Sequence, residues 1–269
     1  MDSRPIGVFD SGVGGLTIVR GLIELMPDEE ILYFGDTARY PYGPRSRDEV
    51  RRFAMEIATW LAEQDVKMLV AACNSAASAG LDHVRDAFPD LHVVEVVEPA
   101  VRAAIRATRN RRIGVIGTEL TIASGAYQRA LDATKENVML FSQACSRFVE
   151  FVERGETAGP EIIELAREYL APLQQEDVDT LILGCTHYPL LQGVLHFVMR
   201  DAVLISSAEE TAQDVYTELT QRNQFRVADT LPRHRFVSSG DAVTFQALGS
   251  RFLGPEIAVV EERSLGPVS

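Results

Sequence analysis

Two cysteines stand in the same local pattern at two places in the chain. Cys73 follows the apolar run MLVAA and precedes two short polar residues, and Cys185 follows TLILG and precedes Thr186 and His187. A thiolate can accept a proton and a thiol can return one, so two opposed cysteines suit the removal of a proton from one face of a carbon and its donation to the other. The pattern predicts inversion at a stereogenic carbon.

Each thiol needs a neighbour that helps it ionise, because a free cysteine has a pKa of about 8.5. We expect Asp10, at the end of the first apolar run, to assist Cys73, and His187 to assist Cys185. A buried structural role is the alternative for either cysteine taken singly. Cys145, in QACSRF, has no matching partner and is interpreted as structural. A zinc site on Cys185 and His187 is disfavoured, since zinc sites show more ligands at recognisable spacing.

The elements that would position these residues alternate along the chain. Segments 47–64 and 161–173 carry apolar residues at helical spacing, and short aliphatic runs separate such segments. This alternation predicts an α/β fold with largely parallel central sheets, in which ligands bind beyond the carboxyl ends of the strands. The predicted strands are IGVF, ILYF, MLVAA, HVVEVV, RIGVIG, NVMLF, TLILG and AVLI.

A weak internal repeat relates the two halves of the chain. The segment 6–11 (IGVFDS) is similar to 113–118 (IGVIGT), 107 residues later, and Cys73 is matched by Cys185, 112 residues later. Two nearly equal offsets predict two pseudo-symmetric α/β halves with the active site in the cleft between them. Chance similarity between aliphatic strands is the alternative.

Composition excludes several classes of function. The formal charge of −13 argues against a nucleic-acid partner, which requires a basic surface. No apolar run approaches the roughly 18 residues of a membrane span, and no basic-then-apolar signal region opens the chain. Three cysteines without a CxxC pair make no disulfide framework, so we expect a cytoplasmic protein with reduced thiols.

No cofactor is expected. The only lysines are Lys67, at the entrance of a predicted strand, and Lys135, in a polar turn, so neither is placed to form a pyridoxal Schiff base. The glycines of segment 9–17 (FDSGVGGLT) lack the third glycine of a dinucleotide fingerprint; they let the backbone approach a small ligand or simply permit a tight turn. The Pro/Gly loop 34–46 (FGDTARYPYGPRS) has backbone N–H groups that could hold a carboxylate; an ordered surface loop is the alternative.

Taken together, these stretches resemble the glutamate racemases, the cofactor-independent branch of the aspartate/glutamate racemase superfamily. The combination is more specific than any single motif, and it covers almost the whole chain in order. The segments are GVFDSGVGGLT (7–17), YFGDTARYPYGPRS (33–46), ACNSA (72–76), EPAVRAA (98–104), GVIGTELTIASGAY (114–127), LGCTHYPLL (183–191), SSAEETAQDV (206–215) and FVSSGDAVTFQALGSRFLG (236–254).

The resemblance implies an isomerase that interconverts L- and D-glutamate without pyridoxal phosphate and supplies D-glutamate for peptidoglycan. It implies an N-terminal domain of residues 1–97 with 208–269, carrying Asp10 and Cys73, and a second domain of residues 98–207, carrying Cys185 and His187. A bacterial cytoplasmic location follows, with glutamate as the small-molecule partner and no membrane partner. The oligomeric state stays open between a monomer and a homodimer.

The resemblance also assigns roles to residues. Cys73 is expected to take the proton from D-glutamate and Cys185 from L-glutamate, with Asp10, His187 and Glu153 assisting. This chain carries Ser146 and Glu150 where the family usually has prolines, which makes Glu150 a rival to Glu153. The expected substrate-binding residues are Ser11, Pro41, Tyr42, Gly43, Asn74, Ser75, Thr118, Thr121 and Thr186, with the loop at 41–43 acting largely through backbone N–H groups.

Two other functions are compatible with the sequence. A related cofactor-independent racemase would use the same cysteine pair on aspartate or a hydantoin. A non-catalytic protein would bind an acidic ligand in the cleft or inhibit another protein. Loss of racemisation on replacing either cysteine would distinguish an enzyme from a binding protein.

Overall fold

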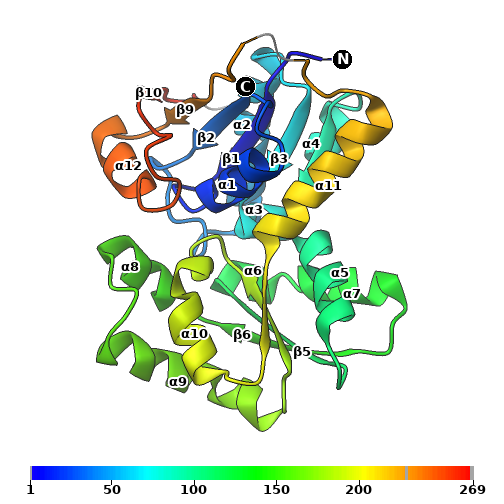
Figure 1. Cartoon of the computed structure of the whole chain (residues 1–269), viewed down its shortest axis with the longest axis vertical. Helices are drawn as coiled ribbons and strands as arrows, with labels where there is room; N and C mark the ends of the chain where they lie inside the picture. Colours follow the sequence, from blue (N-terminus) through cyan, green and yellow to red (C-terminus); the bar gives the residue numbers. More distant parts are fainter. Residues whose placement is uncertain (1, 228–229, 267–269) are drawn as a thin grey trace.

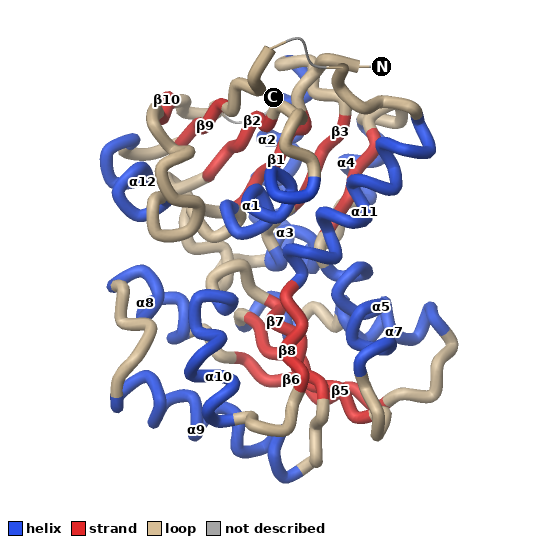
Figure 2. The backbone as a smooth tube through the Cα atoms, viewed as in Figure 1, coloured by secondary structure: helices blue, strands red, loops and turns tan. Residues whose placement is uncertain are grey.

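The computed structural model describes residues 2–227 and 230–266, and it contains two parallel β-sheets, one above the other in Figures 1 and 2. The first sheet has the order β10-β9-β2-β1-β3-β4 and the second β6-β5-β7-β8. The strands are β1 (Ile6–Asp10), β2 (Ile31–Gly35), β3 (Met68–Ala71), β4 (His92–Glu95), β5 (Arg112–Gly117), β6 (Met139–Ala144), β7 (Thr180–Gly184), β8 (Val203–Ser206), β9 (Arg235–Ser238) and β10 (Val260–Glu262).

Helices cover both sheets. The upper group in Figure 1 is α1 (Leu16–Leu25), α2 (Arg47–Glu63), α3 (Asn74–Ala79), α4 (Asp82–Ala87), α11 (Ser207–Arg222) and α12 (Ala242–Gly249). The lower group is α5 (Val97–Ala107), α6 (Glu119–Ala123), α7 (Ala126–Thr134), α8 (Arg147–Arg154), α9 (Pro160–Gln175), the 3-10 turn η1 (Tyr188–Leu191) and α10 (Gln192–Val198).

The two sheets share one strand order. In the first, β2-β1-β3-β4 lie side by side, and in the second β6-β5-β7-β8 do so, each strand standing four numbers later. All pairings are parallel. In each half, the strand that ends just before Ser11 or Thr118 therefore neighbours the strand that leads to Cys73 or Cys185. This is the arrangement that the internal repeat predicts, and the predicted fold class is confirmed.

Side-chain alternation along the strands explains why helices pack on both faces. In β1, Val8 lies in the apolar cluster that contains α1, whereas Phe9 lies in the cluster that contains α2. In β7, Leu181 shares the first cluster with α9, whereas Ile182 packs with α5. The first cluster continues through both halves of the molecule, so the two sheets are joined by buried apolar side chains.

The chain passes between the two sheets twice, after β4 and after β8. At the first crossing the predicted strand HVVEVV stops early. β4 ends at Glu95, whose carboxylate accepts hydrogen bonds from the N–H groups of Val97 (2.6 Å) and Glu98 (2.9 Å). These bonds satisfy free donors at the start of α5, so the chain turns into a helix where the apolar run continues.

The other predicted elements lie close to their expected places. α2 begins one residue after Ser46, which forms a reciprocal capping box with Glu49. α9 begins at Pro160 rather than 161. Two further strands, β9 and β10, are absent from the prediction, because the apolar part of β9 is only Phe236 and Val237 and β10 (VEE) carries two acidic residues. No helix within residues 2–227 and 230–266 is long and apolar enough to cross a membrane.

Candidate active site

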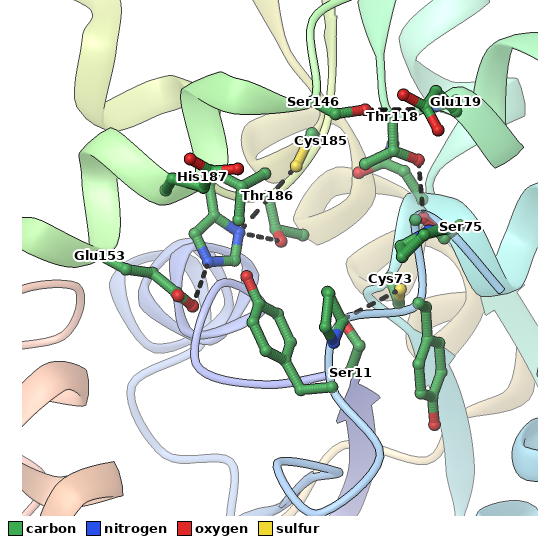
Figure 3. Close-up of a pocket in the computed structure, with 18 residues that line it drawn as sticks. Ser11, Cys73, Ser75, Thr118, Glu119, Ser146, Glu153, Cys185, Thr186 and His187 are labelled. Atoms are coloured by element: carbon green, nitrogen blue, oxygen red, sulfur yellow. Dashed lines mark hydrogen bonds and ion pairs between the residues drawn. The ribbon is translucent and has the colours of Figure 1, made fainter.

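A cavity of about 270 Å³ lies between the carboxyl ends of the two sheets, and both patterned cysteines face it from opposite sides (Figure 3). Cys73 comes from the first sheet and Cys185 from the second. The lining residues are Ser11, Tyr40, Pro41, Tyr42, Gly43, Pro44, Cys73, Asn74, Ser75, Thr118, Glu119, Ser146, Val149, Glu150, Glu153, Cys185, Thr186 and His187.

Cys73 stands between β3 and α3, at the cap position of the helix. Its side chain is buried, and its Sγ lies 3.7 Å from the hydroxyl of Ser11. Burial, together with the negative charge of nearby Asp10, raises the pKa of the Cys73 thiol above its ordinary value. The structure therefore favours the protonated thiol at this position, a form that can donate a proton.

Cys185 has different neighbours. Its Sγ lies 3.9 Å from Nδ1 of His187, and Nε2 of the same ring lies 3.5 Å from Oε1 of Glu153 (Figure 3). Burial alone would lower the pKa of His187, but Cys185 and Glu153 on either side of the ring outweigh it and raise the pKa to about 10. The ring is thus cationic at neutral pH, and a cation beside a thiol stabilises the thiolate. Cys185 is suited to accept a proton.

Asp10 lies beneath the cavity rather than in its wall. Its carboxylate is fully buried, and Oδ2 accepts hydrogen bonds from the N–H groups of Gly12 (3.0 Å) and Gly15 (3.1 Å). Oδ1 has no hydrogen-bond partner among the described residues. The bonds to Oδ2 fix the carboxylate at the start of α1, where the helix dipole stabilises a negative charge.

The glycine-rich turn lets the two halves approach closely. A Cβ on Gly14 would lie 2.2 Å from Oγ1 of Thr186 and 2.6 Å from Nδ1 of His187, both from the opposite half. His187 also meets the ring of Phe252 edge-on, at 5.5 Å between centroids. The turn therefore serves close contact with the second half and holds Asp10; the approach of a small ligand to these glycines stays a prediction.

Hydroxyl groups cluster on the side of the cavity near Cys73. The Oγ of Ser75 lies 3.0 Å from Oγ1 of Thr118 and 3.5 Å from Oγ1 of Thr121, and the two threonine oxygens are 3.0 Å apart. Asn74 donates through Nδ2 to the hydroxyl of Tyr127 at 2.9 Å, which leaves its Oδ1 without a partner in the described part of the chain. The group can both donate to and accept from a polar ligand.

The loop after β2 closes the same side of the cavity. The Tyr42 ring is buried against Phe53 and its hydroxyl donates to Asp36, so only its backbone faces a ligand. Pro41 has no N–H to donate, which leaves the N–H groups of Tyr42 and Gly43 as the available donors. The carbonyl of Gly43 accepts from Leu120 N–H at 3.1 Å, which ties this loop to the second half.

Most of the predicted site residues come together in the cavity wall; Asp10 and Thr121 lie just behind it. Both rival carboxylates, Glu150 and Glu153, line it, and of these Glu153 is the one paired with His187. Sequence reasoning missed Tyr40, Pro44, Glu119, Ser146 and Val149 as lining residues. Tyr40 and Pro44 lie in the Pro/Gly loop 34–46, for which the sequence predicts contacts through backbone N–H groups. The sequence signal for their side chains is their place in this rigid turn.

Neither lysine lines the cavity. Lys67 is buried at the start of β3, where its Nζ contacts Glu29 and the carbonyls of Asp2 (3.0 Å) and Gln224 (2.9 Å). Lys135 caps the far end of α7. Within residues 2–227 and 230–266 no group of three or more His, Cys, Asp or Glu side chains is arranged to hold a metal ion.

Comparison with known proteins gives a consistent result. The family model for Asp/Glu/hydantoin racemases matches residues 7–215. The chain is 53% identical to a glutamate racemase of Parafrankia sp. (strain EAN1pec), over 97% of this chain and 94% of that protein, and 51% identical to one of Corynebacterium diphtheriae, over 97% and 98%. The crystal structure of glutamate racemase from Francisella tularensis in complex with D-glutamate superposes with a TM-score of 0.94, at 34% identity, over 100% of both chains.

Proposed function

We propose, because the chain belongs to the Asp/Glu/hydantoin racemase family, that it is a glutamate racemase, an isomerase that interconverts L- and D-glutamate. One observation of this chain carries the proposal: two thiols from equivalent positions in two similar sheets line one small cavity from opposite sides. A single base would have to carry its proton around the substrate, whereas two opposed groups act on the two faces of Cα at once.

In the direction from L- to D-glutamate, the Cys185 thiolate removes the Cα proton. The electron pair left on Cα then takes a proton from the Cys73 thiol on the opposite face. The negative charge thereby moves from Cys185 to Cys73, and the reverse reaction returns it. The cationic ring of His187 stabilises the first thiolate, and Glu153 balances the charge of that ring.

The substrate's polar groups meet the hydroxyl cluster and the loop after β2. We assign Ser75, Thr118 and Thr121 to one end of the substrate, where their mutual hydrogen bonds keep the hydroxyls oriented. The N–H groups of Tyr42 and Gly43 hold a carboxylate beside them. Ser11, Asn74 and Thr186 complete the binding set. Donors fixed in advance stabilise the charge that develops on the α-carboxylate as the Cα proton leaves.

The test of this function is proton NMR of L-glutamate with the purified protein in D2O, without added cofactor, while circular dichroism is followed. We expect loss of the Cα–H signal together with decay of the dichroism. Neither change, in a folded protein with reduced thiols, would refute the glutamate assignment. Aspartate and a hydantoin, tested in parallel, would reveal a related racemase, and binding of glutamate without exchange would indicate a binding or inhibitor protein.

Glu153 is the carboxylate that we assign to proton transfer. Replacing it with glutamine is expected to lower kcat about ten- to hundredfold, because the amide cannot balance the charge of His187. Glu150→Gln is the matched control, since Glu150 lines the cavity without an ion pair to His187 in the structure. Rates of both variants, measured by circular dichroism, decide the matter; a larger loss in Glu150→Gln would reverse the assignment.

The wider setting follows from the family. D-Glutamate is a building block of peptidoglycan, so we propose a cytoplasmic enzyme of cell-wall synthesis. We also propose that residues 1–97 with 208–269 form one domain, which carries Asp10 and Cys73, and that residues 98–207 form a second, which carries Cys185 and His187; residues 1, 228–229 and 267–269 of the first lie outside the described part. Sedimentation of the purified protein would distinguish a monomer from a homodimer.

A further inference from the structure

Tyr40 has no role in the proton transfer or the substrate binding that is proposed for this site. Its side chain lines the active-site cavity and also a neighbouring cavity of about 300 Å³ formed with α12 and the glycine-rich turn. Glu153 lines the same two cavities. Tyr40 and Glu153 thus form the wall between them, and loss of either side chain would connect the active site with the adjacent space.

The ring of Tyr40 is held from two sides. It lies 6.2 Å from the ring of His187, measured between centroids, with an angle of 31° between the planes. On its other side the backbone of Gly12 approaches so closely that a Cβ there would lie 3.1 Å from Cδ2 of the tyrosine. The ring is therefore fixed in orientation, and so is the position of its hydroxyl oxygen.

The hydroxyl of Tyr40 is buried close to the carboxylate of Glu153. Tyr40 Oη has no hydrogen-bond partner among the described residues, and neither has Nε2 of His187, whose contact with Glu153 is an ion pair at 3.5 Å. Burial, and next the charge of Glu153, raise the pKa of Tyr40, so the phenol keeps its proton. An unmade hydrogen bond on a buried donor is costly. The Glu153 carboxylate lies beside both donors and is the acceptor available to them.

We propose that Tyr40 is a positioning residue, which donates its phenol hydrogen to the carboxylate of Glu153 and holds that carboxylate against Nε2 of His187. The side chain of Glu153 is 29% exposed and is otherwise free to turn toward solvent. With Tyr40 in place, the carboxylate keeps the ring cationic beside Cys185. This inference rests on the proposed function for its kinetic consequence, but its effect on His187 exists in the free protein.

The test is Tyr40→Phe, which keeps the ring against His187 and the wall between the cavities and removes only the hydroxyl. We expect kcat to fall roughly ten- to a hundredfold, the range of one hydrogen bond to a charged group, while KM changes little. Tyr216→Phe is the matched control, because Tyr216 is exposed on α11, away from the cavity. A Tyr40→Phe enzyme with unchanged kcat would overturn the proposal.

A double-mutant cycle separates positioning from a general structural role. If Tyr40 acts through Glu153, Tyr40→Phe has no further effect on kcat in a Glu153→Gln background. Losses that multiply in full would show that the two residues act independently and would also overturn the proposal. A structural defect would lower the rate in both backgrounds.

Nitrogen NMR of the imidazole gives a readout that needs no activity. The charged or titratable groups that face Tyr40 are Glu153 on α8, Asp10 at the end of β1, and Cys185 and His187 after β7. In Tyr40→Phe the released carboxylate of Glu153 attracts the protonated ring of His187 less strongly. The pKa of His187 in this variant should therefore fall below its wild-type value. An unchanged titration contradicts the proposal. A wild type that racemises no substrate would refute the proposed function, yet this titration would still decide the role of Tyr40.

Discussion

Replacing Cys73 with alanine is expected to lower racemisation of glutamate by at least about 10³-fold, and Cys185→Ala is expected to do the same. A positioned acid or base contributes roughly 10²- to 10⁴-fold. Each variant loses the base for one direction and the acid for the other, because both thiols act in every turnover. Decay of the circular dichroism of L- and of D-glutamate measures both directions.

Cys145 supplies the matched control. It is a third buried cysteine, its pKa is raised by burial, and its backbone carbonyl accepts a hydrogen bond from Tyr188 at 3.0 Å, but it does not line the cavity. Cys145→Ala should keep its rate, since the main-chain bond survives. Turnover at the wild-type rate in either Cys73→Ala or Cys185→Ala would eliminate the two-thiol mechanism and favour a binding protein.

Gly14→Ala is expected to reduce kcat by about 10² or more in a protein that still folds. The added methyl group would lie 2.2 Å from Thr186 and 2.6 Å from the ring of His187, closer than any real contact, so these side chains must move. Misplacement of a catalytic group by about 1 Å can cost 10²-fold. Overpacking of this kind destabilises a protein by about 1–3 kcal/mol. Racemisation and urea unfolding measure the two effects.

Gly193→Ala tests whether the loss of kcat in Gly14→Ala comes from the contact between the two halves rather than from a glycine-to-alanine change in general. Gly193 lies in α10 with open space around the position of a Cβ, so alanine there meets nothing and changes stability by at most about 1 kcal/mol. Its rate should equal that of the wild type. If Gly14→Ala also racemised glutamate normally, the two halves would tolerate a wider separation than the structure implies.

The sequence predicts the sheets well because buried parallel strands are continuous apolar runs. It also locates the two thiols, since each follows such a run directly. The strand β4 shows the limit of this signal: the apolar residues continue to Val97, but the carboxylate of Glu95 caps a new helix there. Whether a side-chain cap or a hydrophobic run determines the local structure depends on the backbone geometry, which the sequence pattern does not specify.

Tyr40 shows a second limit. In the sequence it is one aromatic residue in a Pro/Gly loop, and nothing in its spacing links it to Glu153, more than 100 positions later. Only the folded chain brings α8 of the second half to the loop of the first. The sequence also does not distinguish Glu150 from Glu153, because the two lie one helical turn apart. Only the place of the His187 ring in the folded chain shows that Glu153 is its partner.

The two thiols stand at matching places in a repeated sheet, yet one has Ser11 and Asp10 beside it and the other His187 and Glu153. Enantiomers have equal free energy in water, so kcat/KM must be the same from either side however unlike the two thiols are. The chemical inequality of the halves can appear only in how kcat and KM separate, and in the size of the deuterium isotope effect for each enantiomer. A duplicated scaffold can thus diverge in its side chains while the equilibrium it serves remains symmetric.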